Sequence, residues 1–148
     1  MVLSDAIRHI DGSNLASRHL AMRQVNDEIH VWDIVRLWED SDSEASWTSL
    51  RVSDVDLDDA GAWFFDSERP SPKELVAHMR RIVNADLDSP ILLHSDGSIL
   101  DGLHRVAKAS LHNVKSLGAK QFLVGPRPHC ILKAKPPCDL LELRGQER

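Results

Sequence analysis

The stretch 89–109 constrains the fold more than any other part of the sequence. It begins with a short apolar run, 91–93, that follows a proline and is typical of a buried strand entered from a loop. Asp96-Gly97 is a strong tight-turn signal, and residues 98–100 return as a second short strand. A second pair, Asp101-Gly102, ends that strand and begins a helix. The order predicts a hairpin that leads directly into a helix.

The turn before this helix has the chemistry of an anion site. Asp101 is the expected N-cap, because its carboxylate can accept from the free N–H groups of the first turn. Gly102 allows a sharp turn or a close approach of a ligand to the backbone. His104 and Arg105 fall in the first turn and Lys108 one turn later, where basic groups and the helix dipole suit a phosphate. The plain alternative is an ordinary turn that carries a solvated arginine.

Charge along the chain also indicates a local anion site. Residues 102–135 contain seven Lys or Arg and no acidic residue, whereas residues 1–101 contain nine Lys or Arg and twenty Asp or Glu. The whole chain has a net charge of -5, which opposes general adhesion to DNA. The pattern favours one basic site on an acidic protein, provided that these residues also cluster in space.

A longer pattern consists of Pro90-Ile91-Leu92-Leu93, the Asp96-Gly97 turn and the run DGLHRVAKA at 101–109. It resembles the signature of the ParB/sulfiredoxin superfamily, over about residues 71–124. In that superfamily the run follows a helix and builds a nucleotide-binding pocket. The resemblance implies an α/β (α+β) fold with a small mixed sheet flanked by helices. It also implies a nucleoside triphosphate ligand, ATP or CTP with or without Mg²⁺, and a phosphate-binding turn lined by Gly102, His104 and Arg105. We expect Leu103 and Lys108 to complete the phosphate-binding set.

Two activities of that superfamily are not expected here. Sulfiredoxins need a cysteine in a Gly-Cys-His-Arg turn, and the matching residue is Leu103, while Cys130 and Cys138 lie outside the motif. Residues 110–148 show no helix-turn-helix pattern, so sequence-specific DNA binding is not expected either. No Walker-type loop or zinc-binding helix occurs, and we assign no metal ligands.

Three functions are consistent with the sequence. The first is nucleotide binding without further chemistry. The second is an ATP-dependent phosphotransferase or nucleotide hydrolase on the same fold, in which Asp101 or His104 transfers a proton or polarises a phosphate. The third is a protein-interaction module, in which Trp32 and Trp38 on one helix form the contact face and the turn is purely structural.

The N-terminal part is predicted to be helical. Three segments have the caps and apolar spacing of helices: 4–10, 13–25 and 27–39. They predict an N-terminal helical extension at 1–40, which is a candidate for a homodimer contact. The acidic loop 40–46 joins this extension to a ParB/sulfiredoxin-like domain at 47–148. One or two strands are expected within 50–57.

The flanks of the motif predict one more helix and two strands. Ser71, Pro72 and Glu74 form a capping box, and the apolar residues that follow predict a helix with one buried face. On this helix His78 is expected to be a packing or surface residue, and Arg80 and Arg81 either join the basic site or are exposed. A strand is expected at 118–124 and an edge segment at 131–132.

No apolar run is long enough to span a membrane, and the first residues lack the pattern of a signal peptide. We therefore expect a cytoplasmic protein with no membrane partner.

Overall fold

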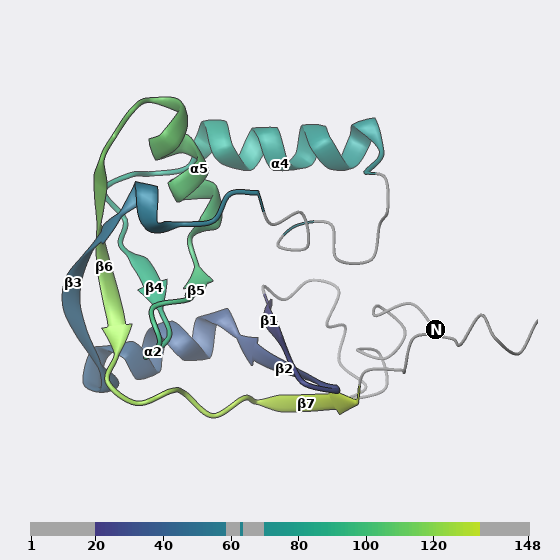
Figure 1. Cartoon of the computed structure of the whole chain (residues 1–148), viewed down its shortest axis with the longest axis vertical. Coiled ribbons are helices and arrows are strands. Elements are labelled where there is room, and N and C mark those ends of the chain that lie inside the picture. Colours follow the sequence, from purple (N-terminus) through teal and green to yellow (C-terminus); the bar gives the residue numbers. More distant parts are fainter. Residues whose placement is uncertain (1–19, 59–62, 64–69, 134–148) are drawn as a thin grey trace, which may run out of the picture.

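The computed structural model describes residues 20–58, 63 and 70–133, which form an α+β fold (Figure 1). The elements, in chain order, are β1 (Leu20–Val25), β2 (Glu28–Asp33), α2 (Ile34–Glu44), β3 (Ala45–Arg51), the 3-10 helix η2 (Val52–Asp54), α4 (Pro72–Asn84), β4 (Ile91–Leu93), β5 (Ile99–Asp101), α5 (Leu103–Leu111), β6 (Ser116–Phe122) and β7 (Cys130–Lys133). None of the described helices is long and apolar enough to cross a membrane.

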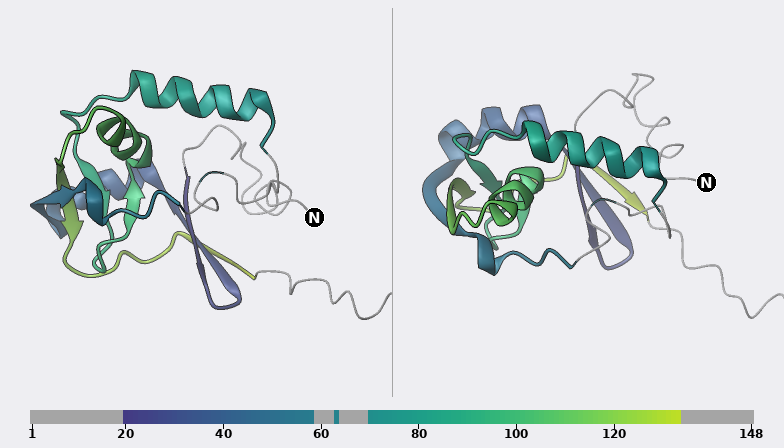
Figure 2. Two further views of the ribbon diagram at one scale, coloured as in Figure 1. Left: turned by 45° about the horizontal axis from the view of Figure 1, so that its top comes forward. Right: turned by 90° about the horizontal axis from the view of Figure 1, so that it is seen from above.

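The larger sheet has the strand order β3-β6-β4-β5 and is mixed, as the sequence predicts. β4 lies parallel to β6, while β3 and β5 pair antiparallel with their neighbours. The smaller sheet, β1-β2-β7, is antiparallel and projects from one side of the molecule (Figure 2). The predicted hairpin, its Asp96-Gly97 turn and the helix that follows are all confirmed.

The larger sheet is covered on both faces because the β4 side chains alternate between two apolar clusters. On one face Ile91 and Leu93 pack with Val106 and Ala109 of α5. On the other face the neighbouring residue of β4 packs against α2 and the smaller sheet, in a cluster made of Ala21, Trp32, Leu37, Leu92, Leu100 and Phe122. The fold therefore has a three-layer arrangement, with α4 lying outside α5 (Figure 2).

The predicted helices at 13–25 and 27–39 are wrong over residues 20–25 and 28–33, whereas residues 34–39 are helical, as the first part of α2. Residues 20–25 and 28–33 are strands, joined by a two-residue turn in which Asn26 has a φ of 56°. Ile29, Val31 and Trp32 are all buried, because β2 is the central strand of its sheet and buries side chains on both faces. Their spacing resembled a helical stripe for that reason. Residues 1–19, and hence the helix predicted at 4–10, lie outside the described ranges.

The two tryptophans do not share a helix face, so the predicted contact face is not formed. Trp32 lies on β2 and is almost fully buried, whereas Trp38 lies on α2 and is half-buried. The predicted loop at 40–46 is instead the end of α2 and the start of β3. The strand expected within 50–57 ends at Arg51 and is followed by η2.

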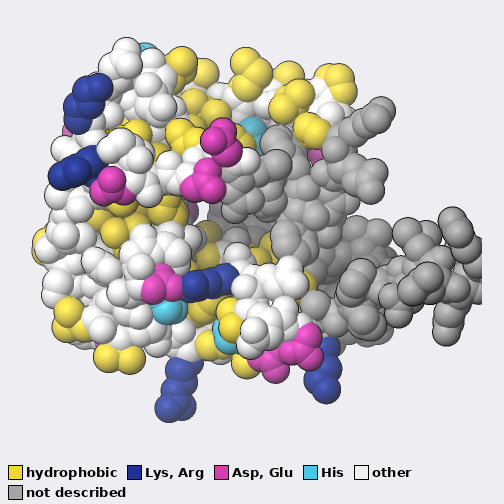
Figure 3. All heavy atoms as spheres, in the orientation of Figure 1, with side chains coloured by type: hydrophobic (Ala, Val, Ile, Leu, Met, Phe, Trp, Pro, Cys, Tyr) yellow, Lys and Arg dark blue, Asp and Glu magenta, His cyan; other side chains and the backbone are white. Residues whose placement is uncertain are grey.

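Helix α4 begins with the predicted capping box, since Ser71 and Glu74 each accept from the other's backbone N–H. The predicted buried face is wrong, because α4 contains no buried residue. Its exposed apolar residues are Leu75, Val76, Met79 and Val83. Hydrophobic side chains accordingly gather along the upper surface over α4 (Figure 3). Apolar burial alone therefore does not hold α4 in place.

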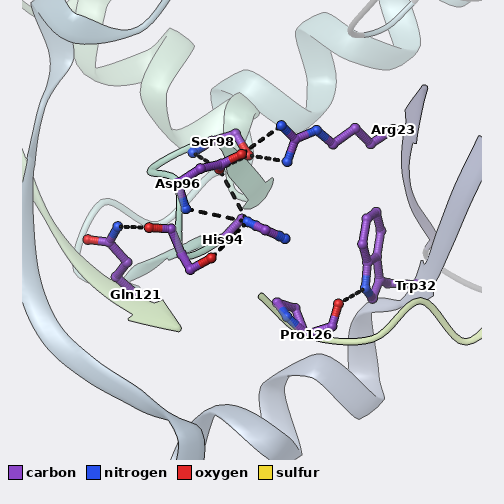
Figure 4. Close-up of polar contacts among 8 residues, drawn as sticks. Arg23, Trp32, His94, Asp96, Ser98, Gln121 and Pro126 are labelled. Atoms are coloured by element: carbon purple, nitrogen blue, oxygen red, sulfur yellow. Dashed lines mark hydrogen bonds and ion pairs between the residues drawn. The ribbon is translucent and has the colours of Figure 1, made fainter. Parts of the chain in front are cut away.

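A polar cluster joins the two sheets at the β4–β5 turn (Figure 4). Arg23 of β1 forms an ion pair of 2.6 Å with Asp96 and also donates to the Ser98 hydroxyl. Nearby, the indole of Trp32 donates to the Pro126 carbonyl. These contacts fix the hairpin of the smaller sheet against the turn of the larger one.

A fall in pH is expected to weaken this polar cluster between the two sheets. The Ser98 hydroxyl, together with Arg23, holds the pKa of the Asp96 carboxyl well below its usual range. Because the folded-state pKa is the lower one, Asp96 stabilises the fold above the pKa of the unfolded chain, about 3.9, and this contribution is lost as the pH falls below it. Urea unfolding should therefore show that Asp96→Asn destabilises the protein at pH 7 and does so less at pH 3. An equal loss at both values would contradict this role.

Candidate functional site

The turn between β5 and α5 is built on Gly102. Its φ of 114° is left-handed, and it occupies the N-cap position without any side-chain cap. The predicted N-cap, Asp101, is therefore one residue too early, because its side chain makes other contacts. The Gly102 carbonyl accepts from the N–H groups of Arg105 and Val106, which starts the helix. The first N–H groups of α5 have no partner within the helix and point out of its end.

Asp101 holds Arg105 rather than the helix end. Its Oδ2 accepts from the Trp38 indole at 2.9 Å and from Arg105 Nη2 at 3.0 Å. The Arg105 side chain is only 16% exposed, so its guanidinium is fixed beside the turn. A guanidinium has five N–H donors, and one contact with a carboxylate leaves others able to bind an anion.

His104 turns toward α4 and joins an aromatic stack. Its Nε2 lies 2.8 Å from Nδ1 of His78, and the two imidazoles are within 12° of parallel. The Trp63 ring stacks on both, with centroid distances of 4.8 Å to His78 and 4.7 Å to His104. Two imidazoles linked by one hydrogen bond thus lie side by side beneath one indole.

Burial in this stack lowers the pKa of both imidazoles. Burial lowers the pKa of His104 to about 4, and the positive charges of Arg81 and of His78, when His78 is protonated, act in the same direction. Burial and Arg81 also lower the pKa of His78. Arg81 therefore acts on the site electrostatically although it is exposed, while Arg80 is exposed as well. A neutral His104 offers one hydrogen-bond donor and no charge.

Lys108 has a structural contact in this structure. Its Nζ donates to the carbonyls of Val83 at 2.8 Å and Ala85 at 2.6 Å, at the end of α4. A cation at a helix C-terminus satisfies free carbonyls and complements the helix dipole. Lys108 therefore connects α5 to the end of α4 instead of standing free beside the turn.

Leu103 lines an open cavity of about 330 Å³ between α4, α5 and the segment after η2. Its other lining residues are Asp56, Leu57, Trp63, Ile82, Ala107, Ser110 and Leu111. Most of these side chains are apolar, so the cavity suits a flat apolar group more than a charged one.

The structure thus brings Asp101, Gly102 and Arg105 together and directs His104 and Lys108 toward α4. Sequence reasoning did not connect Trp38 with this turn, and it gave His78 a packing or surface role only. The sequence also contains the bulky apolar run Trp63-Phe64-Phe65. Trp63 stacks on the histidines, and the other two residues lie outside the described ranges. No spacing rule links His78 to His104, since the pairing depends on how α4 crosses α5.

Within residues 20–58, 63 and 70–133, no group of three or more potential metal-ligating side chains occurs. Comparison of the chain with protein-family models, with curated proteins and with solved structures finds no match.

Replacing Gly102 should destabilise the protein. A Cβ at this position would lie 2.7 Å from Ile91 Cδ1 and 3.1 Å from Arg105 Nε, and the left-handed φ adds strain. We expect Gly102→Ala to lower the free energy of unfolding by about 1–3 kcal/mol in urea titrations. Gly118→Ala is the matched control, because a Cβ there meets nothing within 4 Å. Equal stabilities of the two variants would argue against the close approach.

The histidine pair should make stability depend on pH. Because both pKa values are lower in the folded protein than the 6.5 of a free histidine, the unfolded chain binds more protons below that pH. Stability should fall as the pH drops from 6.5 toward about 4. Urea titrations between pH 7 and 5 should show a smaller slope for His104→Gln than for the wild type. The exposed His112→Gln serves as control, and a slope unchanged in His104→Gln would exclude the pair as its source.

Proposed function

We propose that this chain is a nucleotide-binding domain of ParB/sulfiredoxin-like fold, and that its β5–α5 turn binds a phosphate group. The observation that carries the proposal is Gly102, which opens α5 in a left-handed conformation with no side-chain cap. Such a turn leaves backbone N–H groups directed at an incoming anion, at the positive end of the helix dipole. The resemblance of the surrounding sequence to the superfamily signature supports the same ligand.

Each residue of the turn has a separate role in this proposal. The N–H groups of Leu103 and His104 bind phosphate oxygens, and Gly102 allows the left-handed backbone at the start of α5 without a Cβ against Ile91 and Arg105. Arg105 supplies the donors of its guanidinium that Asp101 does not occupy. His104 donates through Nδ1 when its Nε2 accepts the proton of His78.

The cavity beside Leu103 is proposed to receive the base or sugar of the nucleotide. It begins at the first residue of α5, and apolar side chains and the Trp63 ring line it. Its volume of about 330 Å³ exceeds what a single phosphate requires, which favours a nucleotide over inorganic phosphate. Lys108 would reach a phosphate only by leaving the carbonyls of Val83 and Ala85, so we propose that it supports α4 instead.

Nucleotide binding can be tested by thermal shift. We expect ATP or CTP with Mg²⁺ to raise the melting temperature of the wild type, because a ligand that binds only the folded state stabilises it. Arg105→Lys keeps the charge but loses the fork geometry, so most of this rise should disappear. Arg36→Ala, at an exposed arginine of α2, should retain it. Lys108→Gln should lower the melting temperature without ligand but keep the rise.

Two results would contradict the proposal. One is the lack of any rise with each nucleotide tested in the presence of Mg²⁺. The other is an Arg105→Ala variant that folds and still binds the nucleotide as the wild type does.

Turnover is a separate prediction. If the protein cleaves or transfers the terminal phosphate, and Asp101→Asn or His104→Gln abolishes this activity, the proposal extends from a binding domain to an enzyme.

A further inference from the structure

In the described part of the chain, one edge of strand β3 has no neighbouring strand. It is the outermost strand of the larger sheet, and its one partner in the described part of the chain is β6 (Figure 1). Its residues are exposed except for the half-buried Ala45 and Leu50. The strand contains no proline, its pairing with β6 has no bulge, and its one charge, Arg51, is at its end. Proline, bulges and central charges are the features that normally protect an edge strand from pairing.

The register with β6 identifies the backbone groups that point outward. Leu123 N–H donates to the Glu44 carbonyl, and Val52 N–H donates to the Lys115 carbonyl. In an antiparallel pair every second residue directs both its N–H and its C=O at the partner strand. Even-numbered residues of β3 therefore face β6. The N–H and C=O groups of Trp47, Ser49 and Arg51 face away from it.

The outward N–H and C=O groups of β3 can pair with the same groups of a second copy of the chain. An antiparallel pairing of two β3 strands about a two-fold axis at Ser49 places Ser49 opposite Ser49, and Trp47 opposite Arg51 in both directions. The N–H and C=O groups of all three residues are then hydrogen-bonded. Residues directly opposite share a face, so each indole meets the guanidinium of the other copy. Trp47 is 70% exposed, which leaves its ring accessible for this contact.

We propose that two copies of this chain associate through β3, joining their larger sheets into one continuous sheet. The face on which Trp47 and Arg51 meet is the α2 side, since Trp47 lies opposite Lys120, whose ammonium is 5.1 Å from the indole centroid and binds Asp42 of α2. A second copy fits better than an unrelated strand, because an arbitrary peptide would not place an arginine opposite Trp47. The association uses a different region from the N-terminal segment predicted to contact a partner.

The oligomeric state of the full chain, measured by sedimentation velocity over a range of concentrations, tests the proposal. The wild type should show a reversible monomer–dimer equilibrium. Ser49→Pro removes an outward N–H without affecting the pairing with β6, and should be monomeric. Ser49→Lys places two like charges opposite each other and should raise the dissociation constant roughly five-fold or more. Ser46→Lys, with the same charge on the other face and away from the axis, should dimerise as the wild type does.

Thermal unfolding of each variant shows whether it still folds, and Ser49→Lys keeps the test valid if the proline variant does not. A wild type that stays monomeric at its highest concentration would overturn the proposal. This holds even if the monomer binds an unrelated extended peptide at β3, because the proposed occupant is a second copy of the chain. A dimer that Ser49→Pro and Ser49→Lys leave intact would also overturn it, because its interface would lie elsewhere.

Discussion

The close approach of Gly102 to Ile91 is the constraint on which the site depends. Ile91 is completely buried in β4, and Gly102 is the last residue before α5. A hydrogen atom is all that fits between the helix start and the Ile91 side chain. This contact sets the position of α5 over the sheet. The directions of His104, Arg105 and Lys108 follow from that position.

Polar and aromatic contacts, rather than a buried apolar face, attach α4 to this framework. Lys108 holds the end of α4, and the stack of His78, His104 and Trp63 joins it to the start of α5. The same residues surround the proposed ligand site. Ligand binding and the packing of α4 therefore share contacts, so a change at His104 is expected to affect both.

Local sequence signals predicted the centre of the fold well. The Asp96-Gly97 turn, the helix after Gly102 and the capping box at Ser71 are short-range features that a few neighbouring residues determine. Prediction failed at 20–33, where apolar residues three apart indicated a helix, but the helix at 34–39 is confirmed. In a central strand both faces are buried, so the spacing of apolar residues no longer separates a strand from a helix. Pairing with β7, which is distant in sequence, decided the outcome.

The sequence by itself determined that a glycine turn and two basic residues begin a helix after a buried hairpin, because these features depend on local backbone preferences. Tertiary structure alone decided what those residues contact. Asp101 binds Trp38 of α2 and Arg105, His104 pairs with His78, and Lys108 caps α4. Each partner outside α5 lies more than 20 residues away along the chain. Such contacts arise from the packing of whole helices against the sheet, which no local pattern encodes.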